Sequence, residues 1–65
     1  MHPVVSTNVV AVGYDATTRT MRVQFGSGTY EYSNVDDSLY QSMLLPHPWR
    51  RVGRQVKAHP YRKIG

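Results

Sequence analysis

The chain has 65 residues, no cysteine and a formal net charge of +4. A chain this short buries only about 60% of its unfolded surface, so we expect a single domain over residues 1–65 with a marginal core. The lack of cysteine excludes disulfides and cysteine-ligated zinc. No apolar run approaches the roughly 20 residues of a membrane span, and no signal peptide is visible. We therefore expect a soluble, cytoplasmic protein with no membrane partner.

Charge is distributed unevenly along the chain. All four acidic residues lie in the first 37 positions together with only two arginines, so this part sums to −2. The other six basic residues all follow position 49, and the remainder sums to +6. Such a segment can attract an anionic partner such as nucleic acid, or it can be a solvated surface.

The stretch from Thr20 to Tyr32 predicts a β-hairpin, because apolar and polar residues alternate on both sides of a glycine-containing break. The turn is either Gly26-Ser27 or Ser27-Gly28, and both choices keep the apolar residues together. The shared face consists of Met21, Val23, Phe25, Tyr30 and Tyr32. With Ser27-Gly28 as the turn, Gln24 opposes Glu31 on the reverse face.

Residues 8–14 predict another strand, because Val9 to Val12 is an apolar run rich in β-branched residues. If Asp15 to Thr18 forms a four-residue loop, Val10 and Val12 join the apolar face and Val9 faces away. Strands at about 8–14, 20–26 and 29–34 then make a three-stranded antiparallel meander. We expect Met1 to Pro3 to be frayed.

A helix is predicted at about residues 36–45. Asp36 is a good N-cap residue, and Val35 and Tyr40 have the spacing of a hydrophobic staple. Leu39, Tyr40, Met43 and Leu44 form one apolar stripe for the sheet, and Pro46 ends the helix.

A second short helix is predicted at about 48–57, where Trp49, Val52 and Val56 recur at helical spacing despite Gly53. Arg62 to Gly65 is expected to be a basic tail. The fold class is therefore α+β, a three-stranded antiparallel β-meander packed against one amphipathic helix and followed by a second short helix. The expected core contains Val12, Val23, Phe25, Tyr32 and Leu44.

Catalysis is not expected. The three histidines, His2, His47 and His59, each precede a proline and have no helical metal-site spacing. Asp36 and Asp37 are better explained by helix capping, and no base lies near a serine in sequence. We expect no catalytic residue, no metal and no cofactor.

The whole-chain pattern resembles the KTSC family, small domains named for the C-terminal extension of some lysyl-tRNA synthetases and also found alone in bacteria and phages. The likeness rests on Ser6, Val9 to Asp15, Val23 to Phe25, Gly28, the Tyr-x-Tyr of Tyr30 to Tyr32, Val35, Tyr40, Leu44, Val56-Lys57 and Tyr61. The family usually has a Ser-x-Gly step and then an aromatic and an Asn, where this chain reads Pro48 to Gly53. The resemblance implies this α+β fold, and its synthetase context implies RNA as a partner.

Trp49 among basic residues is the strongest functional signal. Arginine can grip phosphates and tryptophan can stack a base. The candidate nucleic-acid-binding residues are Trp49, Arg50, Arg51, Arg54, Lys57, Arg62 and Lys63. Alternatively, Trp49 closes one end of the core while the arginines face solvent. Tyr30 and Tyr32 could also stack bases, but core packing is the better account of both.

Two hypotheses follow. The first is a small non-catalytic binding module that contacts single-stranded RNA or DNA, with RNA favoured, through the basic C-terminal segment. The alternative is a protein-interaction module, for example a phage or accessory protein that docks on a host protein or self-associates through a strand edge. The sequence leaves the oligomeric state open.

Overall fold

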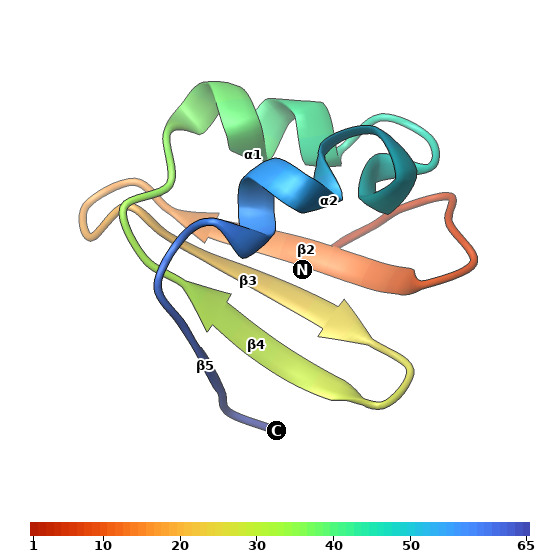
Figure 1. Ribbon diagram of the computed structural model, residues 1–65, viewed down its shortest axis with the longest axis horizontal. Coiled ribbons are helices and arrows are strands. Elements are labelled where there is room, and N and C mark those ends of the chain that lie inside the picture. The colour runs from red at the N-terminus through yellow and green to blue at the C-terminus, as the bar shows by residue number, and fades with distance from the viewer.

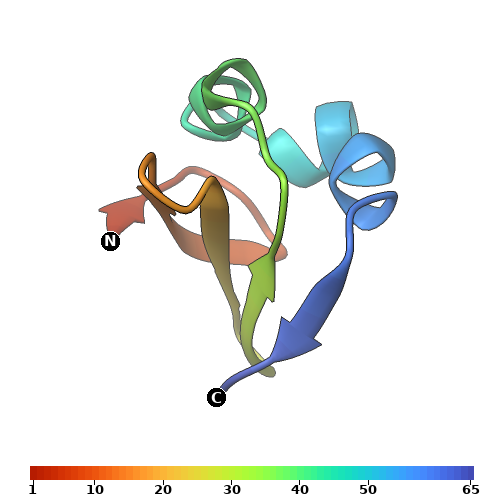
Figure 2. The ribbon, with the colours of Figure 1, turned by 90° about the vertical axis from the view of Figure 1, so that its left-hand side faces the viewer.

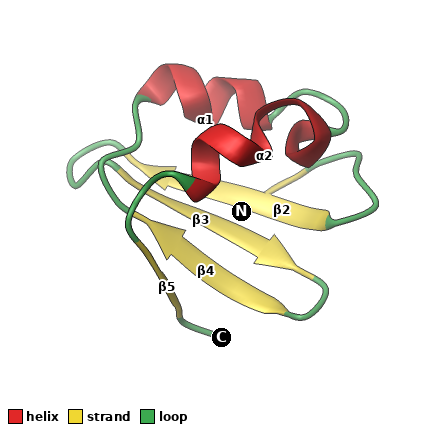
Figure 3. Ribbon diagram, in the orientation of Figure 1, coloured by secondary structure: helices red, strands yellow, loops and turns green.

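The computed structural model describes residues 1–65 as one antiparallel sheet with two helices on a single face (Figure 1). Its elements in chain order are β1 (His2–Pro3), β2 (Val9–Asp15), β3 (Thr20–Phe25), β4 (Gly28–Tyr32), α1 (Asp37–Met43), α2 (Pro48–Lys57) and β5 (Tyr61–Lys63). The strands lie in sequence order across the sheet. Figures 2 and 3 show both helices on the same side, with no helix on the other face. The α+β class is confirmed, but the sheet has five strands rather than three.

The β3–β4 hairpin turns at Gly26-Ser27, the earlier of the two predicted positions. Phe25 pairs with Gly28 and Met21 pairs with Tyr32, so the predicted apolar face is confirmed. The turn position shifts each cross-strand partner by two residues relative to the other choice, which preserves the face but changes the pairs. The expected opposition of Gln24 and Glu31 is therefore wrong, since Arg22 stands opposite Glu31.

Strand β2 contains a register shift that the sequence did not predict. Val12 pairs with Val23, and after an irregularity between Val9 and Ala11 the next pair is Val9 with Phe25. A bulge inserts one extra residue and reverses the alternation beyond it. Val9 is consequently 1% exposed and Val10 is 50% exposed, so the prediction that Val10 faces inward is wrong.

Both chain ends pair with the sheet, which corrects the expected frayed terminus and basic tail. His2 and Pro3 lie opposite Val12 and Ala11. At the other end, β5 pairs with β4, and the Ile64 N–H donates to the Thr29 carbonyl at 2.8 Å. These segments are too short to display a periodic pattern. They are strands because they pair with the two edges of the meander.

Helix α1 begins after the predicted N-cap residue but ends two residues earlier than expected. The Asp36 side chain makes no capping hydrogen bond; Arg19 donates to this carboxylate instead. The prediction that the Asp36 side chain caps α1 by a hydrogen bond is therefore wrong. Tyr40 stacks on Tyr14 with ring centroids 5.0 Å apart, and the Tyr14 hydroxyl donates to the Val35 carbonyl at 2.5 Å.

The core lies between the helices and the helix-facing side of the sheet. Its buried cluster consists of Val9, Val12, Met21, Val23, Tyr32, Val35, Leu39, Met43 and Val56. The predicted core positions Val12, Val23 and Tyr32 are confirmed, whereas Phe25 and Leu44 are only partly buried at its edge. Neither helix has the length and apolar character needed to cross a membrane.

Candidate functional site: an aromatic groove beside α2

The candidate site is a groove of about 420 Å³ between α2 and the outer strands of the sheet, called the aromatic groove below. Strands β4 and β5 run out beyond α2 (Figure 1), so this part of the helix-facing side is not fully covered. The groove is lined by Phe25, Ser27, Tyr30, Tyr32, Trp49, Lys57 and Tyr61. Five of these seven residues are aromatic, and they come from four different elements of the fold.

The five aromatic rings form a closed circuit of contacts. Trp49 meets Phe25 edge-on at 4.9 Å and Tyr32 at 6.5 Å between centroids. Tyr61 lies 5.7 Å from Tyr32 and 6.0 Å from Tyr30, and Tyr30 meets Phe25 edge-on at 5.7 Å. These distances lie in the range of favourable aromatic pairs. Each of the five rings therefore packs against two others of the set.

Strand register and helix geometry explain how the rings meet. Tyr30 and Tyr32 are two apart on β4 and share its helix-facing side. Tyr61 pairs directly with Tyr32 across the β4–β5 ladder, so it faces the same way. Trp49 enters from the first turn of α2, where its indole lies against the backbone of Gly53.

Two lysines border the aromatic groove. Lys57 places its Nζ 5.9 Å from the centre of the Trp49 ring, within cation–π range. Lys63 pairs with Tyr30 on the helix-facing side, and its Cε lies 2.8 Å from the point that a Cβ would occupy at Gly28. The groove therefore combines aromatic faces with positive charge.

The arginines of α2 divide into two kinds. Arg51 donates to the Ser42 carbonyl at 2.7 Å and to the Pro46 carbonyl at 3.1 Å. The first bond is to the last turn of α1 and the second is to the loop that follows it, so Arg51 ties α2 to the end of α1. Arg50 and Arg54 are exposed and make no hydrogen bond or ion pair within the protein.

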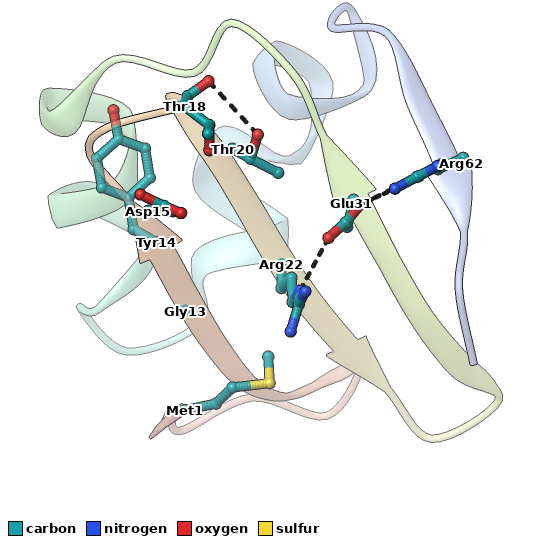
Figure 4. A pocket seen from close by; sticks show the side chains of 9 residues that line it. All are labelled: Met1, Gly13, Tyr14, Asp15, Thr18, Thr20, Arg22, Glu31 and Arg62. Carbon is teal, nitrogen blue, oxygen red and sulfur yellow. Dashed lines mark hydrogen bonds and ion pairs between the residues drawn. The ribbon is translucent and has the colours of Figure 1, made fainter.

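Arg62 lies on the opposite face of the sheet from the aromatic groove. It pairs with Glu31 at 2.9 Å, and Arg22 reaches the other oxygen of this carboxylate at 2.9 Å (Figure 4). Hydrogen bonds from Arg22 first and Arg62 second lower the pKa of Glu31 below its usual 4.5. The predicted set is thus divided: the fold brings Trp49 and Lys57 together, places Lys63 beside Tyr30, and places Arg62 on the other face of the sheet.

A hollow of about 500 Å³ surrounds Glu31 on this far face, and Figure 4 shows the side chains that line it. The hollow is larger than the aromatic groove, yet its wall contains only two hydrophobic residues. Glu31 engages both arginines of the hollow, so each of them already has an ion-pair partner within the protein. The ion pairs of Glu31 connect β3, β4 and β5. The hollow is therefore the weaker candidate for a ligand site.

The sequence prediction missed the part of the site that the sheet contributes. Tyr32 is 4% exposed, so core packing is confirmed for this residue, while Tyr30 is half-buried and lines the groove. Burial first, and then the neighbouring Tyr30 and Tyr61, raise the pKa of Tyr32. The Tyr-x-Tyr pattern of Tyr30 and Tyr32 is recognisable in the sequence. The contact of these rings with Tyr61 depends on β5, a segment that was expected to be a tail.

Comparisons with known proteins agree with the architecture. The family model for the KTSC domain matches residues 5–45, more than half of the chain. The crystal structure of a KTSC domain protein from Yersinia pestis superposes with a TM-score of 0.88 at 31% sequence identity. That alignment covers 98% of this chain and 94% of the other. No curated protein matches the sequence. The chain belongs to the KTSC domain family.

Proposed function

We propose that this chain is a non-catalytic module that binds single-stranded nucleic acid in the aromatic groove. The observation that supports the proposal is the meeting of five aromatic side chains with Lys57 in one solvent-open groove. Stacking of a base on an aromatic side chain contributes about 1–3 kcal/mol and requires an unpaired base. A basic border supplies the accompanying phosphate contacts.

The charges around the groove fit a strand that runs past α2. Lys57 and Lys63 border the groove, and Arg50 and Arg54 are exposed on α2 without internal partners. RNA is the first candidate ligand, because the KTSC family takes its name from an extension of lysyl-tRNA synthetases. Binding of this kind is weak and tolerant of sequence where stacking and phosphate contacts dominate.

Titration of the intrinsic fluorescence of Trp49, the only tryptophan, with single-stranded RNA, single-stranded DNA and duplex tests the proposal. We expect single strands to change the emission and duplexes to bind less well. Affinity should fall with salt by about 0.7 log units per log unit of salt for each phosphate contact. The double variant Arg50→Gln/Arg54→Gln should weaken binding and reduce that slope, with Arg51 kept because it holds α1.

Strand β5 provides a matched pair of control variants. Lys63 and Arg62 are neighbours of equal charge, but Lys63 faces the groove side and Arg62 faces Glu31. Lys63→Gln should reduce affinity more than Arg62→Gln, which removes an equal charge from the other face of β5. Equal effects of the two substitutions would indicate that only net charge matters. No binding by the wild type at low salt would reject the nucleic-acid function.

The second candidate function, a protein-interaction module, is favoured by the open outer edge of β5. An edge strand presents unpaired backbone groups that can accept another strand. Arg62 and Lys63 place charge on this short strand, which disfavours pairing with a second copy. Sedimentation of the purified chain over a range of concentrations tests self-association, and we expect a monomer.

A further inference from the structure

Tyr32 is nearly buried, yet its hydroxyl has no hydrogen-bond partner within the protein. The residue is 4% exposed and lines the aromatic groove. The partly buried Tyr14, by contrast, directs its hydroxyl to the Val35 carbonyl at 2.5 Å. No enclosed side-chain polar atom of the chain lacks a partner, so the Tyr32 hydroxyl reaches solvent, and the residue lines the aromatic groove.

Such a group differs from the usual tyrosine of a core. Buried polar groups are normally paired, and a buried tyrosine usually finds a partner for its hydroxyl. Here the ring packs against Trp49 and Tyr61, with centroids 6.5 Å and 5.7 Å away. A fixed hydroxyl within an aromatic wall is suited to hydrogen-bond the edge of a flat ring that stacks there.

We propose that Tyr32 is the base-reading residue of the aromatic groove, and that its hydroxyl donates a hydrogen bond to the exocyclic carbonyl oxygen of a stacked uracil or guanine. This inference rests on the proposed function, since it assumes that the groove receives nucleic-acid bases. The surrounding rings supply stacking that every base shares. The hydroxyl adds a contact that depends on the functional groups at the edge of the base.

A phenol hydroxyl donates a hydrogen bond more strongly than it accepts one, because its oxygen lone pair is delocalised into the ring. Burial, Tyr30 and Tyr61 all raise the pKa of Tyr32, so the hydroxyl keeps its proton at neutral pH. Lys57 is the cationic group that lines the groove together with Tyr32. Uracil and guanine project a carbonyl oxygen where cytosine and adenine project an amino group. A donor at this place therefore favours the carbonyl-bearing bases.

The test compares oligouridine and oligoadenosine of equal length on three proteins: the wild type, Tyr32→Phe and Tyr61→Phe. Tyr61→Phe is the matched control, because it removes a hydroxyl from an exposed ring of the same groove. We expect the wild type to prefer oligouridine, and Tyr32→Phe to reduce the affinity ratio by roughly threefold to tenfold, the range of one hydrogen bond. Tyr61→Phe should keep the ratio.

The outcomes separate this inference from the function on which it rests. Tyr32→Phe keeps the packed ring and removes an unpaired hydroxyl, so its melting temperature should match that of the wild type. If the wild type binds both oligonucleotides equally, or if Tyr32→Phe retains the preference, the base-reading role is wrong and nucleic-acid binding stands. If the wild type binds neither oligonucleotide, both proposals are wrong.

Discussion

The indole of Trp49 lies against the backbone of Gly53, one turn further along α2. A Cβ at Gly53 would lie 3.0 Å from Cδ2 and 3.2 Å from Cγ of the indole. From another direction, the ring meets Phe25 edge-on at 4.9 Å between centroids. Glycine weakens a helix by roughly 1 kcal/mol relative to alanine. At this position it allows the indole to pack against the helix and form one wall of the aromatic groove.

The first prediction concerns Gly53→Ala. Helix propensity alone would raise stability by about 1 kcal/mol. We expect a lower melting temperature instead, together with altered near-ultraviolet circular dichroism of Trp49, because the new methyl group pushes the indole toward Phe25. Gly26→Ala is the control, since nothing lies within 4 Å of a Cβ at that turn position. A more stable Gly53→Ala protein with unchanged spectra would show that the indole is not held there.

The sheet illustrates what alternation can predict. The two possible β3–β4 turns shift the cross-strand partners by two residues, and side chains two apart share a face. The apolar face was therefore predictable, whereas the partner of Glu31 was not. The inward placement of Val9 depends on a bulge, which arises from pairing with β3 rather than from the local pattern. β1 and β5 have two and three residues, too few for a period to be recognised.

The site was predictable only in its helical half. Trp49 and Lys57 stand out because basic and aromatic residues cluster within a few positions in this region. Tyr30 and Tyr61 are far apart in sequence. Their ring centroids lie 6.0 Å apart only because β5 pairs with β4. Arg51 appeared equivalent to its neighbours, because its bonds to the Ser42 and Pro46 carbonyls depend on how the two helices pack.

The second prediction tests the bulge in β2. Val9→Ala removes two buried methyl groups and should destabilise the protein by about 2 kcal/mol, including a cavity contribution. Val10→Ala should change stability by less than about 0.5 kcal/mol, because this side chain is half exposed. Urea denaturation of the two variants makes the comparison. The reverse order of effects would support the regular register without a bulge.

The third prediction concerns the start of α1. Because the Asp36 carboxylate pairs with Arg19 and caps no backbone amide, Asp36→Asn and Asp36→Ala should have similar effects. Both side chains are more than half exposed, so the coupling between them should be about 0–1 kcal/mol. A double-mutant cycle with Arg19→Gln measures this coupling. A large loss for Asp36→Ala alone, with Asp36→Asn unaffected, would indicate a true N-cap bond.

The last prediction is a pH dependence that originates at Glu31. The pKa of this carboxyl lies below 4.5 in the folded protein, because Arg22 and then Arg62 bond to the charged form. Since the unfolded chain has the higher pKa, this contribution to stability is complete above pH 4.5 and is lost as pH falls through the folded-state value. Glu31→Gln should therefore be less stable than the wild type at neutral pH, and the two stability curves should converge in acid.

Urea denaturation across this pH range provides the measurement, with Asp37→Asn as the control because Asp37 forms no ion pair or side-chain hydrogen bond. Glu31 connects β3 and β5 through its two arginines, so losing its charge should loosen β5 first. Amide exchange of Ile64, which donates to the Thr29 carbonyl, should accelerate in Glu31→Gln. Because β5 carries Tyr61, the same substitution should also weaken the outer wall of the aromatic groove. If the stability curves of Glu31→Gln and the wild type stay parallel with pH and Ile64 exchange is unchanged, the backbone hydrogen bonds between β4 and β5 hold β5 without the ion pairs.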